Sequence, residues 1–176
     1  NIVKHTSSTS DDWTKMRKSK YVQSYIGDAF KQAKNFLIQG KFVLFVGSPC
    51  QIAGLKSYLN KTYDRLITCD FICEGVPPMK LLHDHLQMIA EKLHSKVEAF
   101  NFRPKTEGWT KHFFDASLIS GKMYHMPVQF DPYFGSFSKG FIQRMSCYTC
   151  QYKLRQHAAD ITLADYWGFR RHDPSI

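Results

Sequence analysis

The sequence predicts an α/β fold with a mixed sheet, in which a parallel βαβ core carries an antiparallel extension and helices pack on the faces. In the first half of the chain, segments with apolar residues at helical spacing alternate with short runs of β-forming residues. Beyond Lys96, short segments with alternating apolar residues follow one another, with turn residues between them. The alternation predicts the parallel core, and the later short strands predict the antiparallel part.

The first expected elements are a helix, a strand and a second helix. Residues 24–40 carry apolar side chains at helical spacing and end in a glycine, which predicts a helix. Residues 41–47 are a short apolar run of β-forming residues, typical of a strand buried on both faces. Ser48 followed by Pro49 is the pattern of a helix N-cap, so the second helix is expected over residues 50–59.

A second strand and a third helix complete the parallel core. The strand is expected over residues 65–72, and Gly and Pro break the pattern at residues 75–78 before a helix with apolar spacing over residues 82–93. Two strands joined by a crossover helix form a right-handed unit with parallel strands, so their carboxyl ends meet at one edge of the sheet. Cys50 and Cys73 lie just past those two ends.

The second half of the chain is expected to add short antiparallel strands to the sheet, over residues 97–102, 112–119 and 122–126, with a turn at Ser120-Gly121. Residues 131–141 are aromatic and broken by glycine, and they allow no clear prediction. Residues 1–23 lack a hydrophobic period, so they are expected to be a leader or linker from a missing N-terminal region. Residues 24–176 are then expected to form a single α/β domain.

The chain is basic, with 24 Lys and Arg against 15 Asp and Glu and a net charge of +9. A solvated basic surface explains such a charge most simply, and an acidic partner is the next explanation. Nucleic acid is not expected as a partner, because the sequence has no Arg-rich tract, helix-turn-helix pattern or RNA-binding aromatic motif. No apolar stretch is long enough for a membrane span and the first residues do not form a signal peptide, so a cytoplasmic protein is expected.

Cysteine is the residue type most suggestive of chemistry in this sequence. Cys147 and Cys150 form a CxxC pair, which suits a redox dithiol, half of a zinc site or half of an iron–sulfur site. Cys50 is expected in the first turn of a helix, where the helix dipole favours a thiolate that could be a metal ligand or a nucleophile. Cys69 lies in the middle of a predicted strand and is expected to be an inert core residue.

Histidines and phosphate-binding motifs do not suggest a second site. His83 and His85 fall two residues apart on a predicted helix, so they point to different faces, and surface positions are expected for both. The sequence contains no GxGxxG, GxxxxGK[ST] or GxSxG motif, which argues against a standard dinucleotide, P-loop or α/β-hydrolase site.

Five blocks of sequence occur in a characteristic order: GSPCQIAGL at 47–55, FICEGVP at 71–77, NFR at 101–103 with GW at 108–109, SCYTC at 146–150 and DITLADYWG at 160–168. Together they resemble the ordered motifs of the coenzyme F420 hydrogenase/dehydrogenase beta-subunit family, C-terminal domain, from about residue 21 to residue 168. The sequence departs from the usual motifs at Ser48, Glu74 and Ala164, where the family usually has Thr, His and Gly. The anionic Glu74 beside a cluster could lower its reduction potential.

This resemblance implies an iron–sulfur flavoprotein oxidoreductase that passes electrons between a hydride carrier, such as coenzyme F420, and one-electron acceptors. FAD and a 4Fe-4S cluster are the implied cofactors, and the cluster ligands carried over from the family are Cys50, Cys73, Cys147 and Cys150. The strand-to-helix turn offers backbone N–H groups, which makes Gly47, Ser48 and Gln51 candidates for flavin contacts. No catalytic acid or base is assigned.

The basic charge and the family resemblance suggest partners, and the four cysteines leave one alternative function open. The basic charge suits an acidic electron carrier such as a ferredoxin, and a beta-subunit family implies partner oxidoreductase subunits. Alternatively, the same four cysteines could bind zinc, which would make the chain a non-catalytic interaction module stabilised by a metal.

Overall fold

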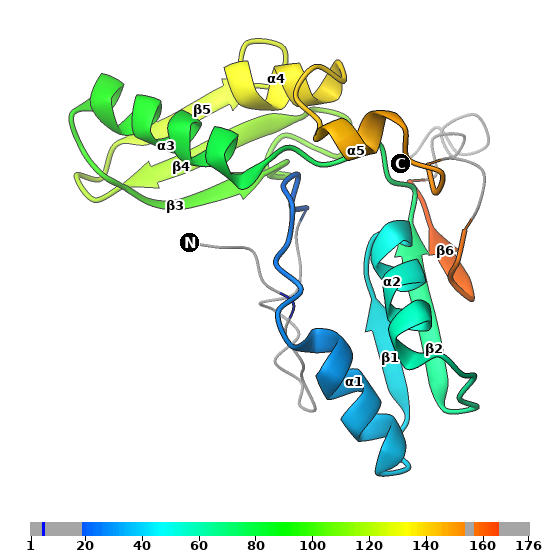
Figure 1. Ribbon diagram of the computed structural model, residues 1–176. Coiled ribbons are helices and arrows are strands. Elements are labelled where there is room, and N and C mark those ends of the chain that lie inside the picture. Colours follow the sequence, from blue (N-terminus) through cyan, green and yellow to red (C-terminus); the bar gives the residue numbers. More distant parts are fainter. Residues whose placement is uncertain (1–4, 6–18, 154–156, 166–176) are drawn as a thin grey trace. The chain divides into compact units, whose positions relative to one another are not determined.

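A computed structural model describes residues 5, 19–153 and 157–165 of the chain. The helices and strands along the described chain are α1 (Ala29–Ile38), β1 (Val43–Val46), α2 (Pro49–Leu59), β2 (Leu66–Phe71), α3 (Met79–Leu93), β3 (Val97–Phe102), β4 (Phe113–Leu118), β5 (Met123–Pro127), α4 (Pro132–Ser138), α5 (Met145–Tyr148) and β6 (Ile161–Leu163) (Figure 1). None of the described helices combines the length and the apolar character that crossing a membrane requires. The α/β class expected from the sequence is confirmed.

The described residues divide into two compact units, each with its own sheet and core. Unit 1 contains the described residues up to Gly27 together with Gly75–Thr149, and unit 2 contains Asp28–Glu74 and the described residues from Cys150 onward. The leader over residues 1–23 and the single domain over 24–176 stay predictions. Ser19 forms an isolated antiparallel bridge with Phe102, and Val22 is buried in the core of unit 1.

Unit 2 is built on a parallel sheet with the strand order β1-β2-β6. β1 and β2 are parallel, with Val43 opposite Leu66, and α2 is the crossover between them, as the sequence predicts. Helices α1 and α2 pack beside this sheet (Figure 1). The core under the two helices consists of Ala33, Leu37, Phe45, Ile52, Leu55 and Leu59.

The expectation that β1 is buried on both faces is wrong for the described residues. Every second residue of a strand points to the same face of the sheet. On the face away from the core, six apolar side chains of the three strands are exposed: Leu44, Val46, Ile67, Phe71, Ile161 and Leu163. A run of apolar residues predicts a strand well, but it does not reveal whether both faces are covered, because covering depends on distant segments.

The first two helices show how local chemistry places their starts. α1 begins at Ala29, later than expected, because Gly27 has a positive φ of 53° that interrupts the helical path. α2 begins at Pro49 after the N-cap residue Ser48, as expected. Proline suits this first helical position, since its missing N–H has no partner in the first turn of a helix.

Unit 1 contains an antiparallel sheet with the order β3-β4-β5. The expected antiparallel strands therefore exist, and they form their own sheet instead of extending the parallel one. β4 and β5 are joined by a turn in which Gly121 has a φ of 81°, a conformation that glycine adopts without strain. The aromatic segment after β5 forms α4, whose N-cap is Asp131.

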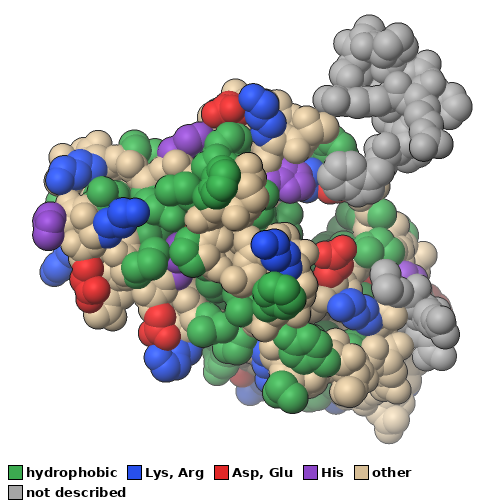
Figure 2. Space-filling view, turned by 90° about the horizontal axis from the view of Figure 1, so that it is seen from above, with side chains coloured by type: hydrophobic (Ala, Val, Ile, Leu, Met, Phe, Trp, Pro, Cys, Tyr) green, Lys and Arg blue, Asp and Glu red, His purple; other side chains and the backbone are tan. Residues whose placement is uncertain are grey.

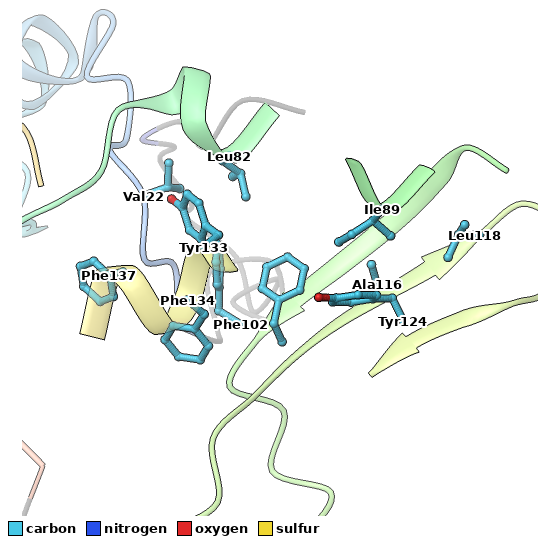
Figure 3. Close-up of a cluster of buried hydrophobic side chains, with 11 residues drawn as sticks. Val22, Leu82, Ile89, Phe102, Ala116, Leu118, Tyr124, Tyr133, Phe134 and Phe137 are labelled. Carbon is cyan, nitrogen blue, oxygen red and sulfur yellow. The ribbon is translucent and has the colours of Figure 1, made fainter. Parts of the chain in front are cut away.

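The core of unit 1 lies between its sheet and helices α3 and α4 (Figure 3). Its buried side chains are Val22, Leu82, Ile89, Phe102, Phe114, Ala116, Leu118, Tyr124, Tyr133, Phe134 and Phe137. Phe102 lies edge-on to Phe114, with ring centroids 5.2 Å apart. More than half of the buried side chains of this core are aromatic, so packing here accounts for part of the high aromatic content of the sequence.

Candidate functional site

Two of the proposed ligand cysteines lie at the carboxyl edge of the parallel sheet in unit 2. Cys50 is the second residue of α2 and follows the end of β1 by four residues, and Cys73 follows β2 by two residues. Cys50 is exposed and Cys73 is partly exposed, and neither forms a disulfide. Cys69, on β2, is buried and only 6% exposed, in agreement with the inert core role expected for it.

The turn between β1 and α2 is held by a compact set of hydrogen bonds. The Ser48 N–H donates to the Gln51 side-chain oxygen at 2.9 Å, as in a capping box. The Ser48 hydroxyl lies 3.3 Å from the Cys50 sulfur, within hydrogen-bond range for sulfur. At Gly47, an added Cβ would lie 3.1 Å from the Gln51 side-chain oxygen, so a side chain at position 47 would press on this arrangement.

The backbone N–H groups proposed for flavin contacts already have partners inside the chain. The N–H of Gly47 donates to the Cys69 carbonyl at 3.1 Å, and the N–H of Gln51 donates to the Ser48 carbonyl at 2.9 Å. Since the Ser48 N–H is also bonded, a flavin at this turn would depend on side chains or on neighbouring N–H groups. The contacts at Gly47, Ser48 and Gln51 stay predictions.

Two motif blocks that are far apart in the sequence touch each other in unit 1. The Arg144 N–H donates to the Val76 carbonyl at 3.0 Å. Gly75 has a φ of 113°, and an added Cβ there would lie 3.2 Å from the Cys147 Cβ and 2.6 Å from Gln143 Cγ. Gly75 is therefore the residue that lets the loop before α3 approach α5, which carries Cys147.

The donor chemistry of the four proposed ligands suits a soft metal or an iron–sulfur cluster. None of the five cysteines forms a disulfide, and the four proposed ligands are the ones with exposed or partly exposed side chains. Cys147 belongs to unit 1, whereas Cys50, Cys73 and Cys150 belong to unit 2. Within the described residues, no three His, Cys, Asp or Glu side chains gather closely enough to hold a metal ion. The four-cysteine ligand set stays a prediction.

Sequence reasoning missed a buried polar network beside β2 in unit 2. The carboxylate of Asp70 is fully buried, accepts a hydrogen bond from the Thr162 hydroxyl at 2.6 Å, and lies 3.2 Å from His157 Nδ1. Thr68 donates both its N–H and its hydroxyl to Asp160, each at 2.7 Å. These hydrogen bonds and the nearby Lys56 hold the pKa of Asp160 below its usual value.

This network ties β6 and the segment before it to β2. Two features of the sequence could have revealed the network. Thr68 and Asp70 are polar residues inside an otherwise apolar strand, and Asp160 is the acidic residue that begins the last motif block. Buried polar side chains in a strand need partners, so their presence implied a second polar segment nearby.

A second buried polar cluster lies in the core of unit 1 and corrects the expectation for His85, which is buried and not at the surface. Its Nε2 lies 3.0 Å from Asp131 Oδ2, at ion-pair distance but without hydrogen-bond geometry. The Tyr124 hydroxyl donates to the same carboxylate at 3.1 Å. Burial, and then the charge of Asp131, raise the pKa of both Tyr124 and Tyr133 well above the usual value.

The basic residues do not gather into one patch on the face seen in Figure 2. On that face, Lys and Arg side chains are scattered among hydrophobic and acidic ones.

Comparison with known protein families identifies the family of this chain. A family model that describes the C terminus of the beta subunit of coenzyme F420 hydrogenase/dehydrogenase matches residues 40–175. No curated protein matches the chain. The matched range contains all four proposed ligand cysteines and the network around Asp70 and Asp160.

Proposed function

The chain belongs to the family formed by the C-terminal domain of the coenzyme F420 hydrogenase/dehydrogenase beta subunit, and on this premise we propose that it is the iron–sulfur flavoprotein module of an oxidoreductase. The module passes electrons between a hydride carrier, coenzyme F420 or a similar compound, and one-electron acceptors. The observation that carries this proposal is the family match over residues 40–175, which points to a redox subunit. Four cysteines with exposed or partly exposed side chains and no disulfide support it.

The residues that hold the cluster in this proposal are Cys50, Cys73, Cys147 and Cys150. When bound, a 4Fe-4S cluster supplies one-electron transfer, and FAD supplies the exchange between a hydride and single electrons. The Ser48 hydroxyl orients the Cys50 sulfur, because the two atoms are 3.3 Å apart, and a hydrogen bond to a ligand sulfur influences the potential of a cluster. Gly75 leaves the space that Cys147 needs beside the loop before α3.

The partners in this proposal are other subunits of the oxidoreductase and an acidic electron carrier of the ferredoxin type. The matching family is that of a beta subunit, which implies association with further subunits. The net charge of +9 favours encounter with an acidic carrier.

The cluster is tested by replacing its proposed ligands in protein purified without oxygen. We expect about four iron atoms and four sulfides per chain, with a brown colour and bound flavin. Cys147→Ser and Cys150→Ser should each lower the iron content and bleach the colour, because each removes one thiolate. Cys69→Ser is the matched control, since Cys69 is buried on β2, and it should retain both.

Metal analysis separates the proposal from the zinc alternative in the same samples. One zinc per chain without sulfide or flavin would contradict the iron–sulfur proposal and support a structural metal site. Equal iron contents in Cys69→Ser and the two CxxC variants would show that the ligand assignment is wrong.

A further inference from the structure

The loop between β3 and β4, residues 103–112, is long for the connection of two antiparallel neighbours. It has ten residues, whereas hairpin loops usually have about two to five. The loop carries one of the motif blocks, and within it the Arg103 guanidinium lies over the Trp109 ring at 5.1 Å. Arg103 and Gly108 both have positive φ values, 55° and 95°, so the loop follows a defined path.

His125 of β5 connects this loop to the antiparallel sheet. Its Nδ1 lies 2.6 Å from Asp115 Oδ1, and Asp115 stands directly opposite on β4. Its Nε2 lies 3.2 Å from Oε1 of Glu107 in the loop. The imidazole also stacks on Phe113, with centroids 4.2 Å apart and planes 17° apart. The ring is thus held flat between a carboxylate of the sheet and a carboxylate of the loop.

We propose that His125 is a proton-dependent clamp, which as an imidazolium holds the 103–112 loop on the sheet through Asp115 and Glu107 and releases the loop when it loses a proton. Only the imidazolium has an N–H on both ring nitrogens. The short contact to Asp115 keeps the last proton on Nδ1, so in the neutral ring Nε2 becomes an acceptor facing the Glu107 oxygen. Two acceptors at that distance repel each other, and the loop loses this contact.

The charges around His125 set the direction of the pH dependence. Hydrogen bonding to Asp115 is the largest cause that raises the pKa of His125 above its usual value. Burial opposes this, and hydrogen bonding to Glu107 and the charges of both carboxylates add to the increase. A hydrogen bond from Lys111, 3.2 Å away, is the main reason why the pKa of Glu107 is lowered. Glu107 therefore stays ionised while His125 titrates.

The groups that act on His125 among the described residues are thus Asp115 from β4 and Glu107 from the loop, with Lys111 acting through Glu107. Because the folded-state pKa of His125 is raised, its contribution is fully present below the unfolded-state value and is lost as the pH rises through the folded-state value.

Amide hydrogen exchange of the full chain tests the clamp without any cofactor. After correction for intrinsic exchange, protection of the loop amides should fall about two- to fivefold as His125 deprotonates, the range expected for exposed ion pairs. His125→Gln should show the lower protection both below and above the pH at which His125 loses its proton. His83→Gln is the matched control, because His83 is an exposed histidine of the same unit, and it should behave like the unaltered chain.

A titration of the histidine side chains by NMR gives an independent readout. Glu107→Gln and Asp115→Asn should each lower the His125 pKa, because each removes one negative partner. An ordinary His125 pKa in the unaltered chain would overturn the proposal. Loop protection that changes with pH equally in His125→Gln and the unaltered chain would also overturn it.

Discussion

At the scale of single residues, Asp131 is the group on which the polar part of the unit 1 core depends. Its carboxylate is fully buried and accepts hydrogen bonds from the Tyr124 hydroxyl at 3.1 Å and from the Phe134 N–H at 2.6 Å. The second of these bonds caps α4. His85 stands 3.0 Å from the same carboxylate and stacks on the Tyr133 ring. One side chain thus joins α3, β5 and α4.

Replacing this carboxylate should destabilise the protein strongly. Asp131→Ala leaves the Tyr124 hydroxyl, the Phe134 N–H and His85 without their common partner in the core. The free energy of unfolding, measured by urea denaturation, should fall by about 2–6 kcal/mol, since each buried donor left unsatisfied costs about 1–3 kcal/mol.

Asp84→Ala serves as the control for this change. Asp84 forms an exposed pair with Lys80 at 2.8 Å on α3, and exposed pairs contribute little to stability. Similar unfolding midpoints for the two variants would show that the buried cluster does not hold the unit together.

At the scale of the elements, the approach of the loop before α3 to α5 depends on a glycine. Gly75 combines a φ of 113° with two close neighbours of an added Cβ, Gln143 Cγ and Cys147 Cβ. Gly121, in the turn between β4 and β5, also has a positive φ, of 81°, but an added Cβ would have no neighbour within 4 Å. A comparison of alanine substitutions at Gly75 and Gly121 therefore separates the effect of backbone strain from the effect of crowding.

Alanine at these two glycines should therefore have unequal effects. Gly121→Ala should cost about 1 kcal/mol of unfolding free energy from backbone strain alone. Gly75→Ala should cost about 2–4 kcal/mol, because crowding adds to strain, and it should change the rate at which Cys147 reacts with a thiol reagent. Equal costs and an unchanged Cys147 rate would contradict a packing role for Gly75.

At the scale of the whole molecule, the excess of positive charge lies early in the chain. Residues 1–60 carry nine Lys or Arg against three Asp, which accounts for +6 of the net charge of +9. Lys15, Arg17 and Lys18 lie outside the described residues, and Lys20 is exposed. A concentration of charge in one part of the sequence can raise the rate at which an oppositely charged carrier arrives.

Electron transfer from an acidic ferredoxin to the cofactor-loaded chain should slow as salt rises. The attraction is screened over roughly 8 Å at physiological ionic strength, so stopped-flow rates should fall between low and high salt. Replacing Lys15, Arg17, Lys18 and Lys20 by Glu should remove most of this dependence.

Reduced methyl viologen, a cation, is the control donor, and its rate should not fall with salt. A ferredoxin rate that responds neither to salt nor to the four substitutions would leave these residues as an ordinary solvated surface.

The sequence by itself determined the features that depend on neighbours along the chain. The Ser48-Pro49 start of α2, the strands on either side of it and the short strands beyond Lys96 were all predictable, because capping, periodicity and turn chemistry act over a few residues. The family motifs and the position of Cys69 within a strand also follow from the sequence, since both can be read locally.

Only the tertiary structure decided which residues meet across long separations. Among the described residues, the antiparallel strands form a separate sheet and one face of the parallel sheet is exposed. His85 is buried against Asp131, and Thr68 binds Asp160 from 92 positions away. In each case the outcome depends on which distant segment covers a surface or supplies a partner. Local periodicity carries no information about that choice, because burial and hydrogen bonding of a side chain are properties of the packed chain as a whole.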